Sequence, residues 1–260
     1  MIHLENEIKA ILIANAGILI QYRNIRILVD GIHFDKRHYF SPMSEKTLNE
    51  FVGGKGRFAN IDFLLFTHNH VDHFSPKYTM EYLKNNMVRT VFMPKKGDGK
   101  CTELKNFMAA RNINARLLDM PFKKRYTYLI GDNIGITVFN TVHMGEQFKD
   151  VENYCYILTI ENKNILFMAD AEYKAEYYEQ SLKNIPIHTV FVNPLYLNNV
   201  QGRNVITQTI KPHQTIIYHI PFQEDDKLEF RKMVKKDIDK YKNQFFTIKP
   251  IQDEFQEIIL

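Results

Sequence analysis

Apolar and polar residues alternate in two stretches of the chain, 17–29 and 155–169, each interrupted by a short polar turn. Alternation on both sides of a polar turn predicts a β-hairpin. Each predicted hairpin is followed by an aspartate, Asp30 in the first case and Asp170 in the second. The two halves of the chain therefore repeat one pattern.

The repeat continues further along each half. An apolar run at 61–67 corresponds to one at 189–193, and a run at 90–94 corresponds to one at 215–221. Short apolar runs bounded by polar residues predict buried strands. Strands that alternate with helical stretches predict sheets covered by helices. We therefore predict one α/β domain over residues 1–260, built from two similar halves. Its expected architecture is a four-layer αβ/βα sandwich, with two mixed sheets face to face and helices outside.

One predicted helix has a clear start, because Ser75 is a good N-cap and Pro76 suits the first helical position. This helix should continue to about Asn86. Other helices are expected over 102–111, 171–183, 205–210 and 222–242.

Composition bears on the cellular compartment of the protein and on the class of its partners. The net charge is +4 and the isoelectric point about 8.8, which alone does not indicate nucleic-acid binding. Cys101 and Cys155 have no CxxC spacing, which fits a reducing compartment. The N-terminus has acids where a signal peptide needs bases, and the apolar run 10–20 is too short to span a bilayer. We expect a cytoplasmic protein with a small-molecule substrate and neither nucleic acid nor membrane as partner; a homo-oligomer is compatible with the sequence.

The candidate chemistry lies directly after the apolar run 63–67, in the pattern H-x-H-x-D-H. Its metal-binding side chains are those of His68, His70, Asp72 and His73. Imidazole and carboxylate suit Zn²⁺, with Mn²⁺ or Fe as alternatives. Residues i and i+2 of an extended segment point the same way, so the first two histidines can hold one ion. The next two ligands lie past the bend and can reach a second ion, which predicts a dinuclear hydrolytic site.

Two ions need more ligands from distant parts of the chain. Three residues qualify because each ends an apolar, strand-like run: His143, Asp170 and His219. The other histidines occupy a terminus, loops, turns or the start of a strand, where a surface or hydrogen-bonded role is the better interpretation.

In this order of motifs the chain resembles the metallo-β-lactamase superfamily, and the resemblance extends from about residue 10 to 220. It implies a fold of the metallo-β-lactamase type and a pair of metal ions bridged by Asp170. It also implies that Asp30 supports the ligands by hydrogen bonds without binding metal. The implied ligands are His68, His70 and His143 for site one, and Asp72, His73 and His219 for site two.

Some features depart from well-known branches of that superfamily. Phe74, Ser75 and Pro76 stand where many members have a glycine, and no cysteine takes a site-two position. The segment between Asp170 and His219 is too short for the extra domain of the nucleases. The chain most resembles small bacterial metal-dependent hydrolases near the ascorbate-phosphate lactonases.

The resulting prediction is a dinuclear metal-dependent hydrolase with two Zn²⁺ ions, Mn²⁺ or Fe being alternatives. A metal-bridging hydroxide would attack an ester, lactone or phosphodiester bond of a small, anionic substrate, and Asp72 would act in catalysis by accepting a proton. Two alternatives stay open: a metal-dependent nuclease or phosphodiesterase that acts on RNA or nucleotides, and a non-hydrolytic metal-binding redox or sensor protein.

The loop 31–40 is rich in aromatic and basic residues and leaves the strand that ends at Asp30. Two interpretations of this loop are equally open. It forms a lid over an anionic substrate, with Arg37 and His38 in contact with it, or its aromatic side chains pack on the domain.

Overall fold

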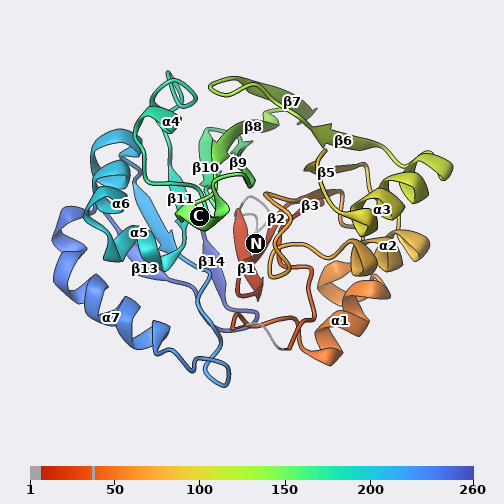
Figure 1. Ribbon diagram of the computed structural model, residues 1–260, viewed down its shortest axis with the longest axis horizontal. Coiled ribbons are helices and arrows are strands. Elements are labelled where there is room, and N and C mark those ends of the chain that lie inside the picture. The colour runs from red at the N-terminus through yellow and green to blue at the C-terminus, as the bar shows by residue number, and fades with distance from the viewer. Residues whose placement is uncertain (1–6, 37–38) are drawn as a thin grey trace, which may run out of the picture. The chain divides into compact units, whose positions relative to one another are not determined.

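A computed structural model describes residues 7–36 and 39–260 (Figure 1). The chain folds into two compact units. The first unit contains Met1–Asp119 and Asp253–Leu260, and the second contains Met120–Gln252. The single-domain organisation over 1–260 stays a prediction.

Within its described residues, the first unit contains a mixed seven-stranded sheet in the order β14-β1-β2-β3-β4-β5-β6. The early strands form antiparallel hairpins, whereas β3, β4, β5 and β6 run parallel to one another. The strands are β1 (Lys9–Ala14), β2 (Gly17–Tyr22), β3 (Ile25–Val29), β4 (Phe63–Leu65), β5 (Thr90–Pro94), β6 (Ala115–Leu118) and β14 (Glu257–Ile259).

Three helices share one hydrophobic core with this sheet: α1 (Glu45–Val52), α2 (Pro76–Asn85) and α3 (Gly99–Ala110) (Figure 1). Alternate strand residues supply one side of the core, for example Leu19 and Leu64. The helices supply the other side, where Phe51 of α1 stacks on Tyr82 of α2 with ring centroids 4.5 Å apart. This core fixes the strand ends that carry the motif.

The second unit contains its own mixed seven-stranded sheet among the described residues, in the order β13-β12-β11-β10-β9-β8-β7. The strands are β7 (Arg125–Gly131), β8 (Ile134–Val142), β9 (Glu152–Ile160), β10 (Lys163–Phe167), β11 (Thr189–Val192), β12 (Gln214–Ile217) and β13 (Ile248–Pro250). The helices are α4 (Glu176–Glu179), α5 (Pro194–Asn198), α6 (Val200–Asn204), the π-helix η4 (Val205–Ile210) and α7 (Phe230–Tyr241).

The repeat predicted from the sequence is present in the strand topology. In each unit three antiparallel pairs lead into four consecutive parallel strands. Strands β2 to β6 of the first unit thus correspond to β9 to β13 of the second, as the paired hairpins at 17–29 and 155–169 predict.

The long helix predicted over 171–183 is wrong, because only Glu176–Glu179 is α-helical there. The preceding residues are held to strand β8. Ala171 forms a β-bridge with His143, and the backbone N–H of Glu172 donates to the carbonyl of Val142 at 2.9 Å. A β-bridge requires extended backbone, so the helix cannot include Ala171.

The helix predicted over 222–242 is correct only in its second half, Phe230–Tyr241. The carboxylate of Asp226 accepts hydrogen bonds from the backbone N–H groups of Phe230 and Arg231, at 2.7 and 2.9 Å. It therefore satisfies the first helical donors and defines where the helix begins. The prediction for 205–210 is confirmed as helical, although its turns are of the wider π type.

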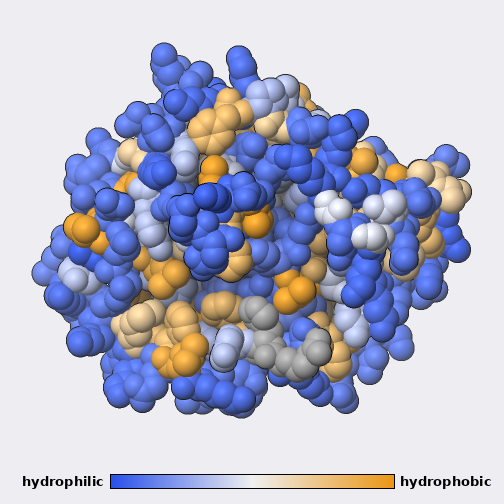
Figure 2. Space-filling view, viewed as in Figure 1, coloured by the Kyte–Doolittle hydropathy of each residue, from blue (hydrophilic) through white to orange (hydrophobic). Residues whose placement is uncertain are grey.

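Residues 7–36 and 39–260 contain no helix that is long and apolar enough to cross a bilayer. On the face in Figure 2, hydrophilic residues predominate and apolar ones form small separate patches.

Candidate metal centre

The H-x-H-x-D-H motif lies at the carboxyl end of β4, in the middle of the parallel part of the first sheet. Parallel strands end at the same edge, so Asp30, just after β3, lies beside Thr67, two residues after β4. After His70 the chain turns sharply, because the N–H groups of His73 and Phe74 both donate to the carbonyl of His70, at 3.1 and 3.0 Å. Helix α2 then begins at its predicted cap, where Ser75 Oγ accepts from a backbone N–H.

Asp30 is the centre of the hydrogen bonds that hold this motif. It is fully buried, and its two carboxylate oxygens accept three hydrogen bonds. Thr67 donates its backbone N–H to Oδ1 at 2.9 Å and its hydroxyl to Oδ2 at 2.6 Å. Nδ1 of His73 lies 2.9 Å from Oδ2. Asp30 therefore holds Thr67 and the ring of His73 in place.

These contacts assign the proton on each ring. A carboxylate only accepts, so Nδ1 of His73 carries the hydrogen that faces Asp30. The hydroxyl proton of Thr67 is already donated to Asp30, so Nδ1–H of His68 donates to Thr67 Oγ1, at 3.0 Å. In both rings Nε2 then carries the lone pair. Metal-binding histidines have this arrangement when the other ring nitrogen donates its hydrogen to a neighbouring acceptor.

The four motif residues form two pairs of donors. The ligand atoms of His68 and His70 lie within 4.8 Å of each other, and their rings meet edge to face with centroids 4.7 Å apart. Nε2 of His73 lies 3.7 Å from Oδ2 of Asp72. All but His70 are buried. The first unit thus supplies two pairs of candidate metal-binding atoms, one from His68 and His70 and the other from Asp72 and His73.

The backbone passes close to itself at Gly17 and Gly31, and this close approach fixes the position of Asp30. Gly31 follows it with φ +78°, and a Cβ built on Gly31 would lie only 2.3 Å from Cα of Gly17. Asp30 itself has φ +53°, in the left-handed region. Strain of this kind is common at functional sites.

One contact of the motif was not predicted from the sequence. Asn69, between the first two histidines, donates its side-chain N–H to the carbonyl of Lys96 at 2.7 Å. Lys96 lies in the loop after β5. Because β5 is parallel to β4, its carboxyl end reaches the same edge and steadies the motif.

The second unit places its three candidate ligands at one edge of its sheet. His143 follows β8, Asp170 follows β10 and His219 follows β12. These strands point the same way, because β8 and β10 are both antiparallel to β9 and β12 is reached through parallel pairs. Oδ2 of Asp170 lies 3.3 Å from Nε2 of His143 and 3.9 Å from Nε2 of His219. One carboxylate oxygen thus faces both imidazoles.

Two asparagines hold Asp170 in this position. Asn193 donates to Oδ1 of Asp170 at 2.9 Å and to the carbonyl of Ala169 at 3.2 Å. Asn153 Oδ1 accepts the backbone N–H of Asp170 at 3.2 Å. Sequence reasoning missed both. The signal for Asn193 was present in Asn193-Pro194, an N-cap followed by proline after a strand, as at Ser75-Pro76.

His143 has its ring orientation fixed in the same way as the motif histidines. Its Nδ1 lies 2.6 Å from the carbonyl of Met144, so Nδ1 donates and Nε2 carries the lone pair toward Asp170. The N–H of Met144 in turn donates to the carbonyl of Asp170 at 2.7 Å, which joins the two ligand segments.

Behind Asp170, two buried tyrosines hold the segment that leaves the site. Their hydroxyl oxygens lie 2.7 Å apart, and those of Tyr196 and Tyr178 also lie 2.7 Å from the carbonyls of Ala171 and Glu172. Burial holds the pKa of both hydroxyls well above the ordinary value. They therefore remain hydrogen-bond donors at neutral pH.

The described part of the loop 31–40 packs on the first unit. His33 is buried and its Nε2 lies 3.2 Å from the carbonyl of Ser41, while the ring of Phe34 meets Tyr78 edge to face. Lys36 pairs with Glu45 at 2.9 Å on the surface. These contacts favour the packing interpretation. Arg37 and His38, the two residues that a lid would use, lie outside the described residues.

The donor set fits divalent transition metals. Neutral imidazole nitrogens and carboxylate oxygens, held by a second layer of hydrogen bonds, suit Zn²⁺, Mn²⁺ or Fe²⁺. Three of the rings gain their orientation from Asp30, Thr67 and the carbonyl of Met144.

No family model matches the chain, and no curated protein matches it. Solved structures do. A variant of the β-hydroxylase CmlA, a diiron enzyme from Streptomyces venezuelae, matches 98% of this chain with a TM-score of 0.68 at 15% identity. This chain spans only about half of that protein, 54%.

Two shorter proteins match from end to end. One is described as a possible metal-dependent hydrolase from Veillonella parvula, with a TM-score of 0.63, 12% identity, and coverage of 98% of this chain and 100% of that one. The other is Igni18, a metallo hydrolase from Ignicoccus hospitalis, with a TM-score of 0.57, 8% identity, and coverage of 98% and 99%.

The chain shares its fold with these three solved structures. Its α/β fold class is the one that the sequence predicts, with two mixed seven-stranded sheets among the described residues.

Proposed function

We propose that the chain is a dinuclear metal-dependent hydrolase of small, anionic substrates with an ester, lactone or phosphodiester bond. The observation that carries this proposal is the position of Asp170 Oδ2, which faces two imidazole nitrogens at 3.3 and 3.9 Å. An anionic oxygen placed between two metal-binding groups suits a ligand shared by two cations.

The proposed ligand set combines the donors of both units. His68 and His70 would hold one ion with His143, and Asp72 and His73 would hold the other with His219. Asp170 would serve both. Three kinds of support favour this set: the order of the motifs, the paired donors in each unit, and metal-dependent hydrolases among the proteins of the same fold.

Two bound divalent cations would lower the pKa of water toward about 7 and polarise the substrate oxygen. The chain's own residues would orient the reacting groups. Asp72 would accept a hydrogen bond from the attacking water and then its proton, since a carboxylate can accept both. Asp30 and Asn193 would keep the ligands in place during the reaction.

A second candidate is oxidative chemistry at a diiron centre, favoured by the diiron β-hydroxylase of the same fold. A third is a nuclease or phosphodiesterase that acts on RNA or nucleotides. The ligand types suit iron as well as zinc, so the choice of metal is part of the test. A cytoplasmic location is also part of the proposal, supported by two cysteines that form no disulfide.

The test is to assay protein of defined metal content on a panel of substrates. Chelated protein is reloaded with Zn²⁺, Mn²⁺ or Fe²⁺ and assayed on an aryl ester, a lactone, bis(4-nitrophenyl) phosphate and RNA. We expect metal-dependent hydrolysis of at least one small substrate without any need for O₂. Oxygen consumption by the iron-loaded protein, with no hydrolysis under any loading, would favour the diiron alternative. Cleavage of RNA with a steep salt dependence would favour the nuclease.

A further inference from the structure

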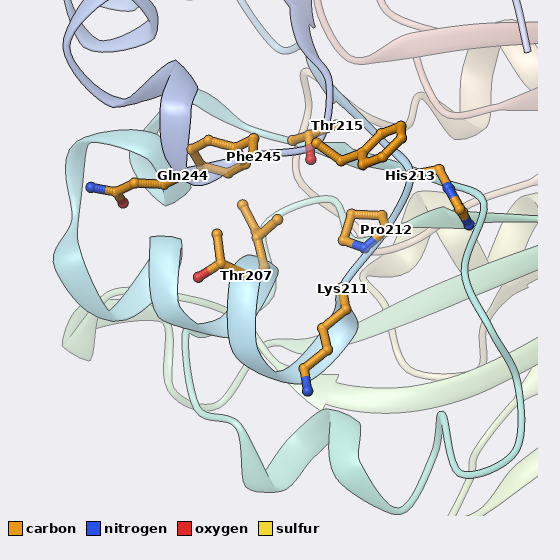
Figure 3. A pocket seen from close by; sticks show the side chains of 9 residues that line it. Thr207, Lys211, Pro212, His213, Thr215, Gln244 and Phe245 are labelled. Carbon is orange, nitrogen blue, oxygen red and sulfur yellow. The ribbon is translucent and has the colours of Figure 1, made fainter.

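A cavity of about 290 Å³ lies in the second unit, at the amino end of β12 (Figure 3). His213 and Thr215 line it, whereas His219 follows the other end of the same strand. The two histidines are six positions apart at opposite ends of this strand, which corresponds to roughly 20 Å. The cavity is therefore separate from the candidate metal ligands.

Apolar and aromatic side chains form about half of the cavity wall. Figure 3 shows the ring of Phe245 across the cavity from Thr207 and Pro212. Phe246, which also lines the cavity, is 81% exposed, and the edge of its ring meets the ring of His213, with centroids 5.4 Å apart. An exposed phenyl ring beside an apolar wall offers a flat surface on which another ring can stack.

The polar part of the lining is basic. Lys211 and His213 contribute to it, and none of the lining residues is acidic. His188 stacks on His213 with ring centroids 5.8 Å apart, and burial together with Lys163 and His213 lowers the pKa of His188. The electrostatic field at this end of the strand thus favours an anion.

The backbone at the cavity adopts two uncommon conformations. The π-helix Val205–Ile210 ends here, and Lys211 follows it with φ +53° while its N–H donates to the carbonyl of Ile206 at 2.8 Å. π-helical turns are frequently found at functional sites, and left-handed residues other than glycine cost free energy. Together they turn the chain so that Lys211 lies at the rim of the cavity.

We propose that this cavity binds a small aromatic anion, such as an aromatic carboxylate. Its ring would lie between Phe245, Phe246 and Pro212. Its carboxylate would pair with the ammonium group of Lys211, which is directed outward from the rim in Figure 3 and would turn toward the bound anion. The volume is close to the lower end for ligand sites, about 300 Å³, and fits one or two fused rings.

The probe is 2-naphthoate, titrated into the metal-loaded protein at low salt and followed by calorimetry. The uncharged analogue is 2-naphthamide. We expect one saturable site for 2-naphthoate and at least about fivefold weaker binding of the amide. Binding should be the same after chelation, because the cavity uses no metal ligand.

Two variants and one control complete the test. Lys211→Asn removes the charge and keeps a residue type that tolerates the left-handed backbone. Phe246→Ala removes the exposed ring. Each should weaken 2-naphthoate binding about three- to tenfold, whereas Lys235→Asn on the exposed side of α7 should leave it unchanged. The proposal is overturned if the wild type shows no saturable binding up to about 10 mM. It is equally overturned if both variants bind like the wild type, or if chelation abolishes binding.

Discussion

Replacement of Asp30 by asparagine isolates the role of the hydrogen bonds behind the motif. The side chains have the same shape, and asparagine tolerates the left-handed φ of +53° at this position. The variant therefore changes one oxygen to an amide and removes the charge, with little effect on packing. Asp30 accepts three hydrogen bonds, so one of them must be lost.

The magnitude follows from which bond is lost. The amide oxygen best replaces Oδ2, which accepts two hydrogen bonds, and the amide N–H₂ then faces the backbone N–H of Thr67 at about 2.9 Å. One unsatisfied buried donor costs about 1–3 kcal/mol, and the two remaining bonds lose part of their charge-assisted strength. Relief from burying a charge offsets part of this loss. We expect the free energy of unfolding to fall by about 2–4 kcal/mol, or the Tm by roughly 5–15 °C.

The assay separates stability from ligand orientation. Thermal unfolding is measured on the chelated variant and wild type, because bound metal would add its own stabilisation. Metal affinity is then measured by competition with a chelating dye. Loss of a carboxylate that orients a ligating histidine lowers metal affinity about 10- to 100-fold.

Asp62→Asn is the matched control. Asp62 is also a nearly buried carboxylate of the first unit, and it accepts the N–H of Arg26 at 2.9 Å and pairs with Arg89 at 2.8 Å. It precedes β4, at the end of the strand opposite to the motif. Asp62→Asn should lower stability and leave metal affinity within about twofold of the wild type, since it orients no ligand. The reasoning about Asp30 is refuted if Asp30→Asn binds metal as tightly as Asp62→Asn.

Three further predictions concern particular contacts. Gly31→Ala should lower the free energy of unfolding by at least about 2 kcal/mol in a denaturant titration, because its Cβ would lie 2.3 Å from Cα of Gly17 at φ +78°. Asn193→Ala should weaken metal binding about 10-fold or more, since Asp170 loses its 2.9 Å amide partner. Burial raises the pKa of the Cys155 thiol to about 12, so native protein at pH 8 should react with a thiol reagent at least about a hundredfold more slowly than unfolded protein.

Each of these has its own control. Gly99→Ala should be harmless, because nothing lies within 4 Å of a Cβ there, and equal losses in the two alanine variants would contradict the close-approach argument. Asn164→Ala is the control for Asn193→Ala, because Asn164 donates to the carbonyl of Pro186 and contacts no candidate ligand. If the two variants weaken metal binding equally, Asn193 does not position Asp170. Unfolding lowers the Cys155 pKa, so its contribution to stability is present at neutral pH and is lost as pH rises from about 9 toward 12. Fast labelling of this thiol in the native protein would contradict its burial.

The hairpins and the start of α2 could be predicted because their signals are local. Alternation over 17–29 and 155–169 needs only neighbouring residues, and Ser75-Pro76 identifies a helix start by itself. The helix predicted over 171–183 failed for the opposite reason. Its first residues hydrogen-bond to strand β8, some 30 residues earlier, and no local pattern records that pairing.

The edge strands were missed in the same way. β7 is exposed along most of its length and therefore lacks the alternation of buried and exposed residues that indicates a strand. β14 is only three residues long and pairs with β1, at the other end of the chain. Such strands form because a partner offers hydrogen bonds, which the sequence alone does not show.

Most of the candidate site could be predicted because each proposed ligand ends an apolar run. Its supporting residues could not be predicted so easily. Asn193 and Asn153 are single amides whose role depends on contact with Asp170 across 23 and 17 residues. The role of Asp30 came from the resemblance, and the structure shows its hydrogen bonds to Thr67 and His73.

Metal content of the purified, metal-reloaded chain tests the central claim most directly. We expect about two transition-metal ions per chain by elemental analysis, falling to about one in His70→Ala and below one in Asp170→Ala, with Asp62→Asn unchanged. One carboxylate shared by two ions explains why Asp170→Ala should cost the most. A chain that holds no transition metal after reloading, or that loses the same amount in all three variants, would contradict the dinuclear account.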